Sequence, residues 1–168
     1  MASYCFDTSG FSKALQDIPM SLFPGLWVFV KDKIEAGEIA VNKEIFDELI
    51  LIDSGFGDFI QANKDNILFE VGQDGWDWGA YLETNSNMVL NQHDHISDYN
   101  GGSPKTVCLN DVSGVSLAKS LNLPLVSGES PTMNLAQTKK RKIPDICAAE
   151  RVVHMTFNEF LMAEGYQG

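Results

Sequence analysis

The sequence predicts an α/β protein, a three-layer sandwich in which helices cover both faces of a central parallel sheet of four to five short strands. Two observations lead to this fold class. Short apolar runs of strand length alternate along the chain with segments whose apolar residues recur at helical spacing. The runs are short and apolar, as in a parallel sheet buried under helices on both faces. A length of 168 residues suits one domain, 1–168, with one sizeable core.

The first predicted strand is the apolar run 4–6, which ends at Asp7. Residues 8–10 are Thr, Ser and Gly, and these residue types predict a turn. A helix is expected over 22–36, where apolar residues recur at helical spacing. Trp27 lies beside the apolar stripe of this helix, and we therefore expect it in the core.

The second predicted strand is 39–41. Asn42 follows it and is a residue type that caps helices, so we expect a helix from there to about residue 53. Residues 55–57, Gly-Phe-Gly, are read as a stop for this helix. The middle of the chain is hard to read: a helix is expected over 76–90 and a loop over 92–104.

The C-terminal third contains clearer signals for both helices and strands. Pro144 suits the first turn of a helix, and Thr156 with Glu159 has the spacing of a capping box. The expected elements are a helix from Asn110 or Asp111 to Leu121, a strand over 123–127, a helix over 144–150, a strand over 152–155 and a last helix after Thr156.

Four acidic residues occupy positions that one site could share: Asp7, Glu48, Asp111 and Glu129. Asp7 and Glu129 follow predicted strands, and parallel sheets bind ligands at the carboxyl ends of their strands. Clustered carboxylates supply the oxygen ligands that Mg²⁺ and Mn²⁺ prefer. Each acid also has a plain alternative, because Glu48 fits a solvated helix face and Asp111 fits the first turn of a helix. No single one of the four carries the prediction.

The net charge is −11, from 12 basic and 23 acidic residues. This is the wrong sign for a protein that handles nucleic acid, since phosphate binding rests on Lys and Arg. Bound metal would neutralise some of the acids. The one basic run either forms a local RNA-binding patch or is a solvated loop, and it consists of Lys139, Lys140, Arg141 and Lys142.

Cysteine usage and hydropathy indicate a soluble cytoplasmic protein. Cys5, Cys108 and Cys147 are far apart and odd in number, which predicts free thiols and neither a disulfide framework nor a zinc ribbon. No run approaches the roughly 20 apolar residues of a membrane helix, and the N-terminus lacks a secretory signal. The segment 93–95, His-Asp-His, is read as a surface loop, since a structural zinc site needs four ligands.

Several segments together resemble the PIN-domain nucleases. Residues 4–9, YCFDTS, are similar to the opening strand of that family, and Glu48 within 44–49, EIFDEL, matches its second acid. The stretch from Asp111 to Glu129 is similar to the helix of the third acid and the strand of the fourth. Residues 142–147, KIPDIC, resemble a segment of one bacterial PIN-like subfamily, where it follows a Lys-rich loop. The resemblance covers most of the chain.

The resemblance implies an endoribonuclease that requires Mg²⁺ or Mn²⁺ and cleaves single-stranded RNA, and often a toxin held inactive by a protein antitoxin. The four acids would hold the cation, with Thr8 and Ser9 orienting Asp7 or a bound water and Asp145 as an outer acid. We also expect that the chain can form a homodimer. The alternative function is a catalytically inactive PIN-like module that binds a protein partner.

Two departures from the family pattern bear on these expectations. The fourth acid is Glu129, where Asp is commoner, and this favours an altered metal contact or the inactive module. The helix after Asp111 contains Ser113 and Gly114 where the family usually has larger apolar residues. Gly114 weakens a helix by about 1 kcal/mol relative to Ala, and close packing against the sheet would explain its presence.

Overall fold

Five parallel strands form a single sheet in the order β3-β2-β1-β4-β5. The computed structural model describes residues 1–102 and 106–168. β1 is central and pairs with β2 through Cys5 and Ala40 and with β4 through Cys5 and Leu125. The strands are β1 (Tyr4–Phe6), β2 (Ile39–Asn42), β3 (Leu68–Phe69), β4 (Leu125–Val126) and β5 (His154–Met155). The predicted fold class, an α/β protein with a parallel sheet, is confirmed.

Side chains of each central strand alternate between two hydrophobic cores, as the period-2 geometry of a strand requires. In β1, Phe6 belongs to one core and Cys5 to the other. In β4, Val126 and Leu125 divide in the same way. Both faces of the sheet are therefore buried, which explains why the strands read as continuous apolar runs.

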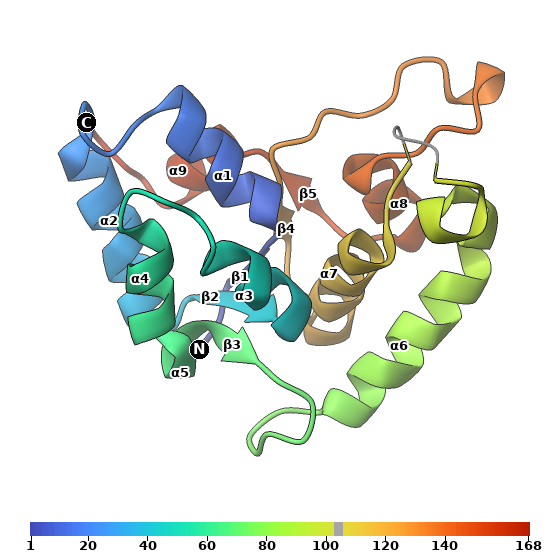
Figure 1. Cartoon of the computed structure of the whole chain (residues 1–168), viewed down its shortest axis with the longest axis horizontal. Helices are drawn as coiled ribbons and strands as arrows, with labels where there is room; N and C mark the ends of the chain where they lie inside the picture. The colour runs from blue at the N-terminus through green and yellow to red at the C-terminus, as the bar shows by residue number, and fades with distance from the viewer. Residues whose placement is uncertain (103–105) are drawn as a thin grey trace.

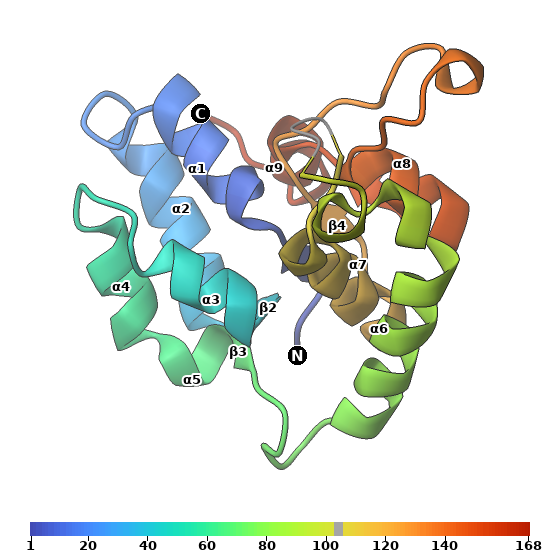
Figure 2. The same ribbon diagram turned by 45° about the vertical axis from the view of Figure 1, so that its right-hand side comes forward.

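Helices on one face of the sheet pack into the core that contains Phe6 (Figures 1 and 2). They are α1 (Thr8–Asp17), α2 (Pro24–Glu35), α3 (Lys43–Leu49), α4 (Phe56–Ala62), α5 (Lys64–Ile67) and α9 (Phe157–Ala163). The core that contains Cys5 is covered by α6 (Trp78–Asn91), α7 (Leu109–Leu121) and α8 (Ile143–Glu150). In the described part of the chain, no helix combines the length and apolar character needed to cross a bilayer.

Aromatic side chains fill the first core. The rings of Phe6 and Phe11 stack with centroids 4.3 Å apart, and Phe160 meets Phe6 edge-on at 5.1 Å. Trp27 is buried here, as predicted, and its indole N–H donates to the carbonyl of Ile18. This contact ties α2 to the end of α1, so the helix that begins beside Asp7 is held at both of its ends.

The expected turn at 8–10 was wrong, because these residues form the first turn of α1. Asp7 is its N-cap and accepts the backbone N–H of Ser9, which satisfies one of the free amides at the helix start. Gly10 is required by close packing: an added Cβ would lie 2.7 Å from the carbonyl oxygen of Val126. A glycine that lets a helix approach a strand looks, in sequence, like a glycine in a turn.

The reading of 55–57 as a helix stop was also wrong. The helix after Asn42 ends earlier, at Leu49, and Gly55 is the N-cap of the separate helix α4, with φ of 79°. A left-handed φ is a conformation that favours glycine. The helices α4 and α5 and the strand β3 were not anticipated. The expected loop over 92–104 contains short 3-10 helices at His93–His95 and Ser97–Tyr99, and residues 103–104 lie outside the described chain.

Local capping signals were read correctly. Asn42 accepts the backbone N–H of Ile45 at 3.1 Å and begins α3, and Thr156 and Glu159 form the predicted capping box. The helix α7 begins slightly earlier than predicted, with Cys108 as its N-cap. Asp111 is therefore a first-turn residue that accepts the backbone N–H of Cys108 at 2.8 Å.

Gly114 lies against α3, not against the sheet as expected. A Cβ at this position would meet the Ile45 side chain at 3.8 Å, an ordinary contact distance. We therefore expect Gly114→Ala to stabilise the protein by about 0.5–1 kcal/mol, because alanine is the better helix former and restricts the unfolded chain. Urea denaturation monitored by circular dichroism measures this change. A destabilised variant would show that α3 and α7 approach more closely than these contacts allow.

Candidate functional site

The centre of the sheet contains a topological switch point. From β1 the chain moves outward to β2 and β3, and it then returns to place β4 and β5 on the other side of β1. In open parallel sheets, ligands bind at such a point, outside the carboxyl ends of the two strands that flank it. Asp7 directly follows β1, and Glu129 lies shortly after β4. Both acids are therefore carried to the position where this topology favours a binding site.

Asp7 is the most deeply buried of the four predicted acids, with 4% of its surface exposed. Its Oδ2 accepts the Ser9 hydroxyl at 2.6 Å and the Ser9 backbone N–H at 3.0 Å. Burial raises the pKa of Asp7 to about 6; the Ser9 hydrogen bonds act against this increase, and the nearby Asp111 and Glu129 carboxylates add to it. Asp7 therefore carries a charge that the folded protein disfavours near neutral pH.

Glu48 connects the beginnings of two helices. The hydroxyl of Thr8, at the start of α1, donates to one of its carboxylate oxygens, and Asn110 Nδ2 donates to the other at 2.9 Å. Thr8 is adjacent to Asp7 and Asn110 is adjacent to Asp111. Glu48 is thus held between the start of α1, beside Asp7, and the start of α7, beside Asp111.

Asp111 and Glu129 complete the group. Burial is the main cause that raises the pKa of Asp111, and the neighbouring Glu48 carboxylate contributes. Burial likewise raises the pKa of Glu129, with a further contribution from Asp111, although its Oε2 accepts the backbone N–H of Ile143 at 2.8 Å. The mutual influence of these carboxylates shows that they share one electrostatic environment.

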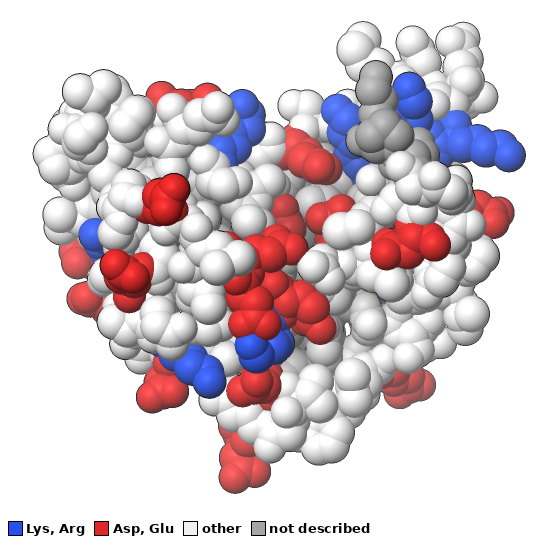
Figure 3. Space-filling view, in the orientation of Figure 1, with Lys and Arg blue, Asp and Glu red and all other residues white. Residues whose placement is uncertain are grey.

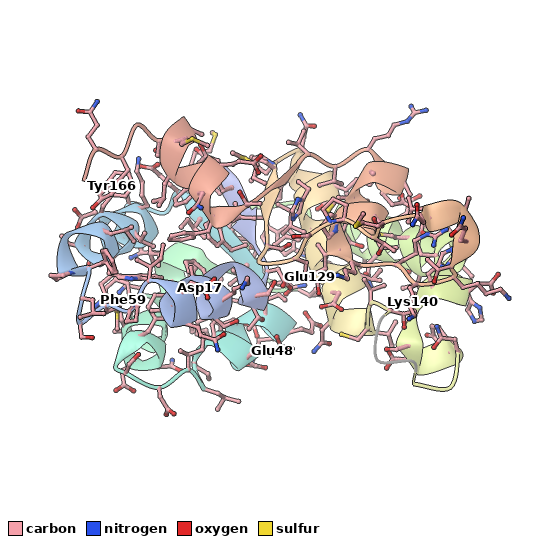
Figure 4. All side chains as sticks on the ribbon, turned by 90° about the horizontal axis from the view of Figure 1, so that it is seen from above. Asp17, Glu48, Phe59, Glu129, Lys140 and Tyr166 are labelled. Atoms are coloured by element: carbon pink, nitrogen blue, oxygen red, sulfur yellow. The ribbon has the colours of Figure 1, made fainter. Side chains whose placement is uncertain are left out.

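This acidic group forms no ion pair in the part of the chain that the structure describes. Among residues 1–102 and 106–168, none of the four carboxylates forms an ion pair with a Lys, Arg or His side chain. Figure 3 shows acidic side chains gathered in the hollow at the centre of one face, and Figure 4 shows Glu48 and Glu129 near the middle of the molecule. Within the same described ranges, no three Asp, Glu, His or Cys side chains are arranged so that they could hold a metal ion as they stand.

The oxygen chemistry of the group nevertheless suits a hard cation. Carboxylates, the Asn110 amide and the hydroxyls of Thr8 and Ser9 surround the switch point, and Mg²⁺ and Mn²⁺ prefer such donors. A cation here would also relieve the repulsion that raises the pKa values of Asp7, Asp111 and Glu129. The carboxylates would have to rearrange to coordinate one ion.

The raised pKa of Asp7 predicts that this residue contributes a loss of stability to the metal-free protein as the pH rises from about 4 to above 6. In that range Asp7 is more protonated in the folded state than in the unfolded state, so its contribution to the free energy of unfolding decreases with pH. Asp7→Asn should flatten this dependence and preserve the cap of α1, because Asn caps helices as well as Asp. Thermal melts in chelator across this pH range measure the effect. Identical slopes for the two proteins would contradict the assigned environment of Asp7.

The outer predicted residues have different surroundings. Asp145 is buried, and its carboxylate accepts the backbone N–H groups of Thr132 and Lys142. These hydrogen bonds lower the pKa of Asp145 despite the opposing effect of burial. Asp145 thus fixes the two ends of the loop that joins Glu129 to α8, and its closeness to the site shows only as a small charge effect on Glu129.

The basic run lies on that same loop. Lys139 and Lys140 are exposed and line a cavity of about 650 Å³ together with His95 and Tyr99. Arg141 is bound to backbone carbonyls of its own loop, and Lys142 is close enough to lower the pKa of Glu129. In the segment 93–95, His93 and Asp94 are exposed, in line with the predicted surface position, whereas His95 is half-buried and its Nδ1 lies 3.1 Å from the carbonyl oxygen of Lys139.

Several residues that organise the site were not recognised from the sequence. Asn42 caps α3 and also donates to the Ser113 hydroxyl of α7 at 2.8 Å, so it links the helices that carry Glu48 and Asp111. Asn110 holds Glu48 directly. The position of Asn42 directly after a buried strand, like that of Asp7, is a signal that could have identified it.

Ser127 and His154 form a second unrecognised pair at the ends of β4 and β5. Ser127 is fully buried, and its Oγ lies 2.7 Å from His154 Nε2. The same hydroxyl accepts the backbone N–H of Glu129 at 3.3 Å. The pair therefore anchors the start of the loop that carries Glu129. Burial lowers the pKa of His154, which favours a neutral ring in this hydrogen bond.

The fold and this arrangement define a parallel α/β protein with an acidic pocket at the switch point of its sheet. The chain belongs to the family described as Domain of unknown function (DUF4411), which matches residues 4–167. The match spans the whole site, from the strand before Asp7 to the last helix. No curated protein matches the chain.

Proposed function

We propose that the protein is a metal-dependent endoribonuclease that cleaves single-stranded RNA at the switch point of its sheet. One observation carries the proposal: acids with raised pKa values, of which Asp7 is buried and Asp111 and Glu129 are half-buried, lie close enough to influence one another and form no ion pair with the described residues. Such an arrangement costs stability, and a bound divalent cation is the simplest way to offset it. The cation would be held by Asp7, Glu48, Asp111 and Glu129.

The resemblance to PIN-domain nucleases supports the choice of chemistry. The parallel sheet is consistent with that fold, and the resemblance matches the four acids to the family's metal ligands. When bound, Mg²⁺ or Mn²⁺ supplies a water of lowered pKa and stabilises charge on a phosphoryl oxygen. The same resemblance favours a cytoplasmic toxin of a toxin–antitoxin system, with a protein antitoxin as its partner.

The remaining residues would position the acids and the substrate. Ser9 holds Asp7 by two hydrogen bonds, and Thr8 and Asn110 hold the two oxygens of Glu48. These contacts restrict the carboxylates to orientations near the switch point. Exposed Lys139 and Lys140, on the loop that joins Glu129 to α8, provide positive charge for the RNA backbone.

Cleavage of a labelled single-stranded RNA by the purified chain tests the proposal. We expect cleavage with Mg²⁺ or Mn²⁺, none with chelator, and slow cleavage of the same RNA annealed to its complement. The activity should co-elute with the protein on size exclusion, which separates it from contaminating ribonucleases. An absence of cleavage under all cation conditions, with no antitoxin present, would contradict an enzymatic function.

A non-catalytic binding module is the second candidate. The net charge of −11 and the lack of a ready-made three-ligand group in the described chain favour it. Under this hypothesis the acidic pocket would receive basic side chains of a protein partner, and RNA would be neither bound nor cut. Failure of RNA to bind in chelator, combined with salt-sensitive binding of a basic protein partner, would favour this candidate.

A further inference from the structure

A second cavity adjoins the acidic group on the side of α1. It has a volume of about 310 Å³ and lies between α1, the segment after β4 and the start of α9. This volume is at the lower end of the range of about 300–1,000 Å³ that is typical of small-ligand pockets. Its lining includes Ser9, Lys13, Ile18, Glu129, Phe157 and Asn158.

The cavity and the acidic group share a wall. Ser9 lines the cavity, and its hydroxyl donates to Asp7 and accepts the backbone N–H of Gly128 at 3.0 Å. Glu129 also lines the cavity and is a member of the acidic group. The Lys13 side chain packs closely against Gly128. A Cβ added to that glycine would lie 2.8 Å from the Lys13 Cβ. A group bound in the cavity would therefore lie directly beside the carboxylates.

The lining combines the features that a nucleoside requires. Ile18 and Phe157 provide apolar surface, whereas Ser130 and Asn158 place hydrogen-bonding groups at the rim. A nucleobase has apolar faces and polar edges, so it matches this division. Lys13 is paired with Asp17, but both side chains are 56% exposed, and such exposed surface pairs contribute little to stability. Lys13 can therefore exchange Asp17 for a phosphate at little cost.

We propose that this cavity binds one nucleotide of the RNA, the one next to the phosphate that lies over the acidic group, with Lys13 on its backbone. The inference rests on the proposed function and adds a subsite to it. Because a base held in a Watson–Crick pair cannot enter the cavity, occupancy requires an unpaired nucleotide. The cavity then accounts for a preference for single strands.

The test measures RNA binding in chelator, where cleavage cannot occur. The probe is a fluorescently labelled single-stranded 12-nucleotide RNA followed by anisotropy at several salt concentrations. Lys13→Gln should weaken binding for every sequence and reduce the slope of log K against log salt by about 1, as expected for one lost phosphate contact. Lys64→Gln is the matched control, since Lys64 begins α5, which leads into the amino end of β3 and so lies away from the site.

A second variant fills the cavity. Ser130 is an exposed loop residue at the rim, so Ser130→Trp should block the cavity without disturbing the core. Its RNA affinity should fall at least about tenfold, whereas its thermal stability and cation response should equal those of the wild type. Wild-type affinity in both Lys13→Gln and Ser130→Trp overturns the subsite, even if cleavage is intact. If both variants weaken RNA binding but the wild-type chain does not cleave RNA in Mg²⁺, the subsite is supported and the proposed nuclease function is overturned.

Discussion

Asp7→Asn is expected to abolish cation-dependent RNA cleavage, with a decrease of at least about a hundredfold in kcat/KM. The substitution removes the charge that a hard cation requires, and the stabilisation that a bound cation supplies amounts to several kcal/mol, each 1.36 kcal/mol being tenfold in rate. The shape of the side chain is kept, and Asn still accepts the Ser9 N–H that caps α1. Initial rates on labelled single-stranded RNA at saturating Mg²⁺ measure the decrease.

The matched control for this variant is Asp47→Asn. Asp47 lies on α3 next to Glu48, but its carboxylate is exposed and paired with Lys43. This control removes one acid from the same region without touching the pocket, so it should cleave like the wild type. Equal cleavage by the wild-type chain and Asp7→Asn would show that the activity belongs to a contaminant, and the binding-module candidate would then gain support.

Millimolar Mg²⁺ or Mn²⁺ should raise the melting temperature by about 5–10 °C at neutral pH. A ligand that binds only the folded state at 100 times its Kd contributes about 2.7 kcal/mol, and each kcal/mol corresponds to about 2–4 °C for a chain of this size. The shift should be small in Asp7→Asn and in Glu48→Gln, which lack part of the proposed cation site. It should also decrease at pH 5, where protons compete for Asp7, whose pKa is raised to about 6.

Two controls separate specific binding from screening of surface charge. Sodium chloride at the same ionic strength should produce a much smaller shift, since screening acts on exposed charges and less on buried ones. Asp47→Asn should respond to Mg²⁺ like the wild type. A shift of equal size in Asp7→Asn and in the wild type would place the bound cation elsewhere on this acidic surface and would remove the main support for the nuclease.

The acidic group makes the folded chain less stable at neutral pH than its apolar cores alone would. Asp7 is buried, Asp111 and Glu129 are half-buried, and all three have raised pKa values, so each in its ionised form destabilises the folded chain at neutral pH. The large apolar cores on both faces of the sheet offset this cost. An energetically unfavourable arrangement that is offset by packing elsewhere in the chain is typical of a functional site.

The sequence was sufficient for features that depend on near neighbours. The apolar runs before Asp7 and before Glu129 predicted buried parallel strands, and Asn42 and Thr156 predicted helix starts, because caps and strand patterns involve residues only a few positions apart. It failed at Gly10 and Gly55. Both look like loop residues, but one allows α1 to approach β4 and the other begins α4 with a left-handed φ.

Which acids meet, and what surrounds them, was decided by tertiary structure. Glu48 is held by Asn110, 62 positions away, and Ser9 bonds Gly128 across 119 positions. Contacts of this kind follow from the strand order, which places β1 beside β4, and a single sequence contains no periodicity that reports such an order. Position after a strand therefore identified Asp7 as a candidate, whereas its partners, its raised pKa and the adjoining cavity exist only because the folded sheet brings remote segments together.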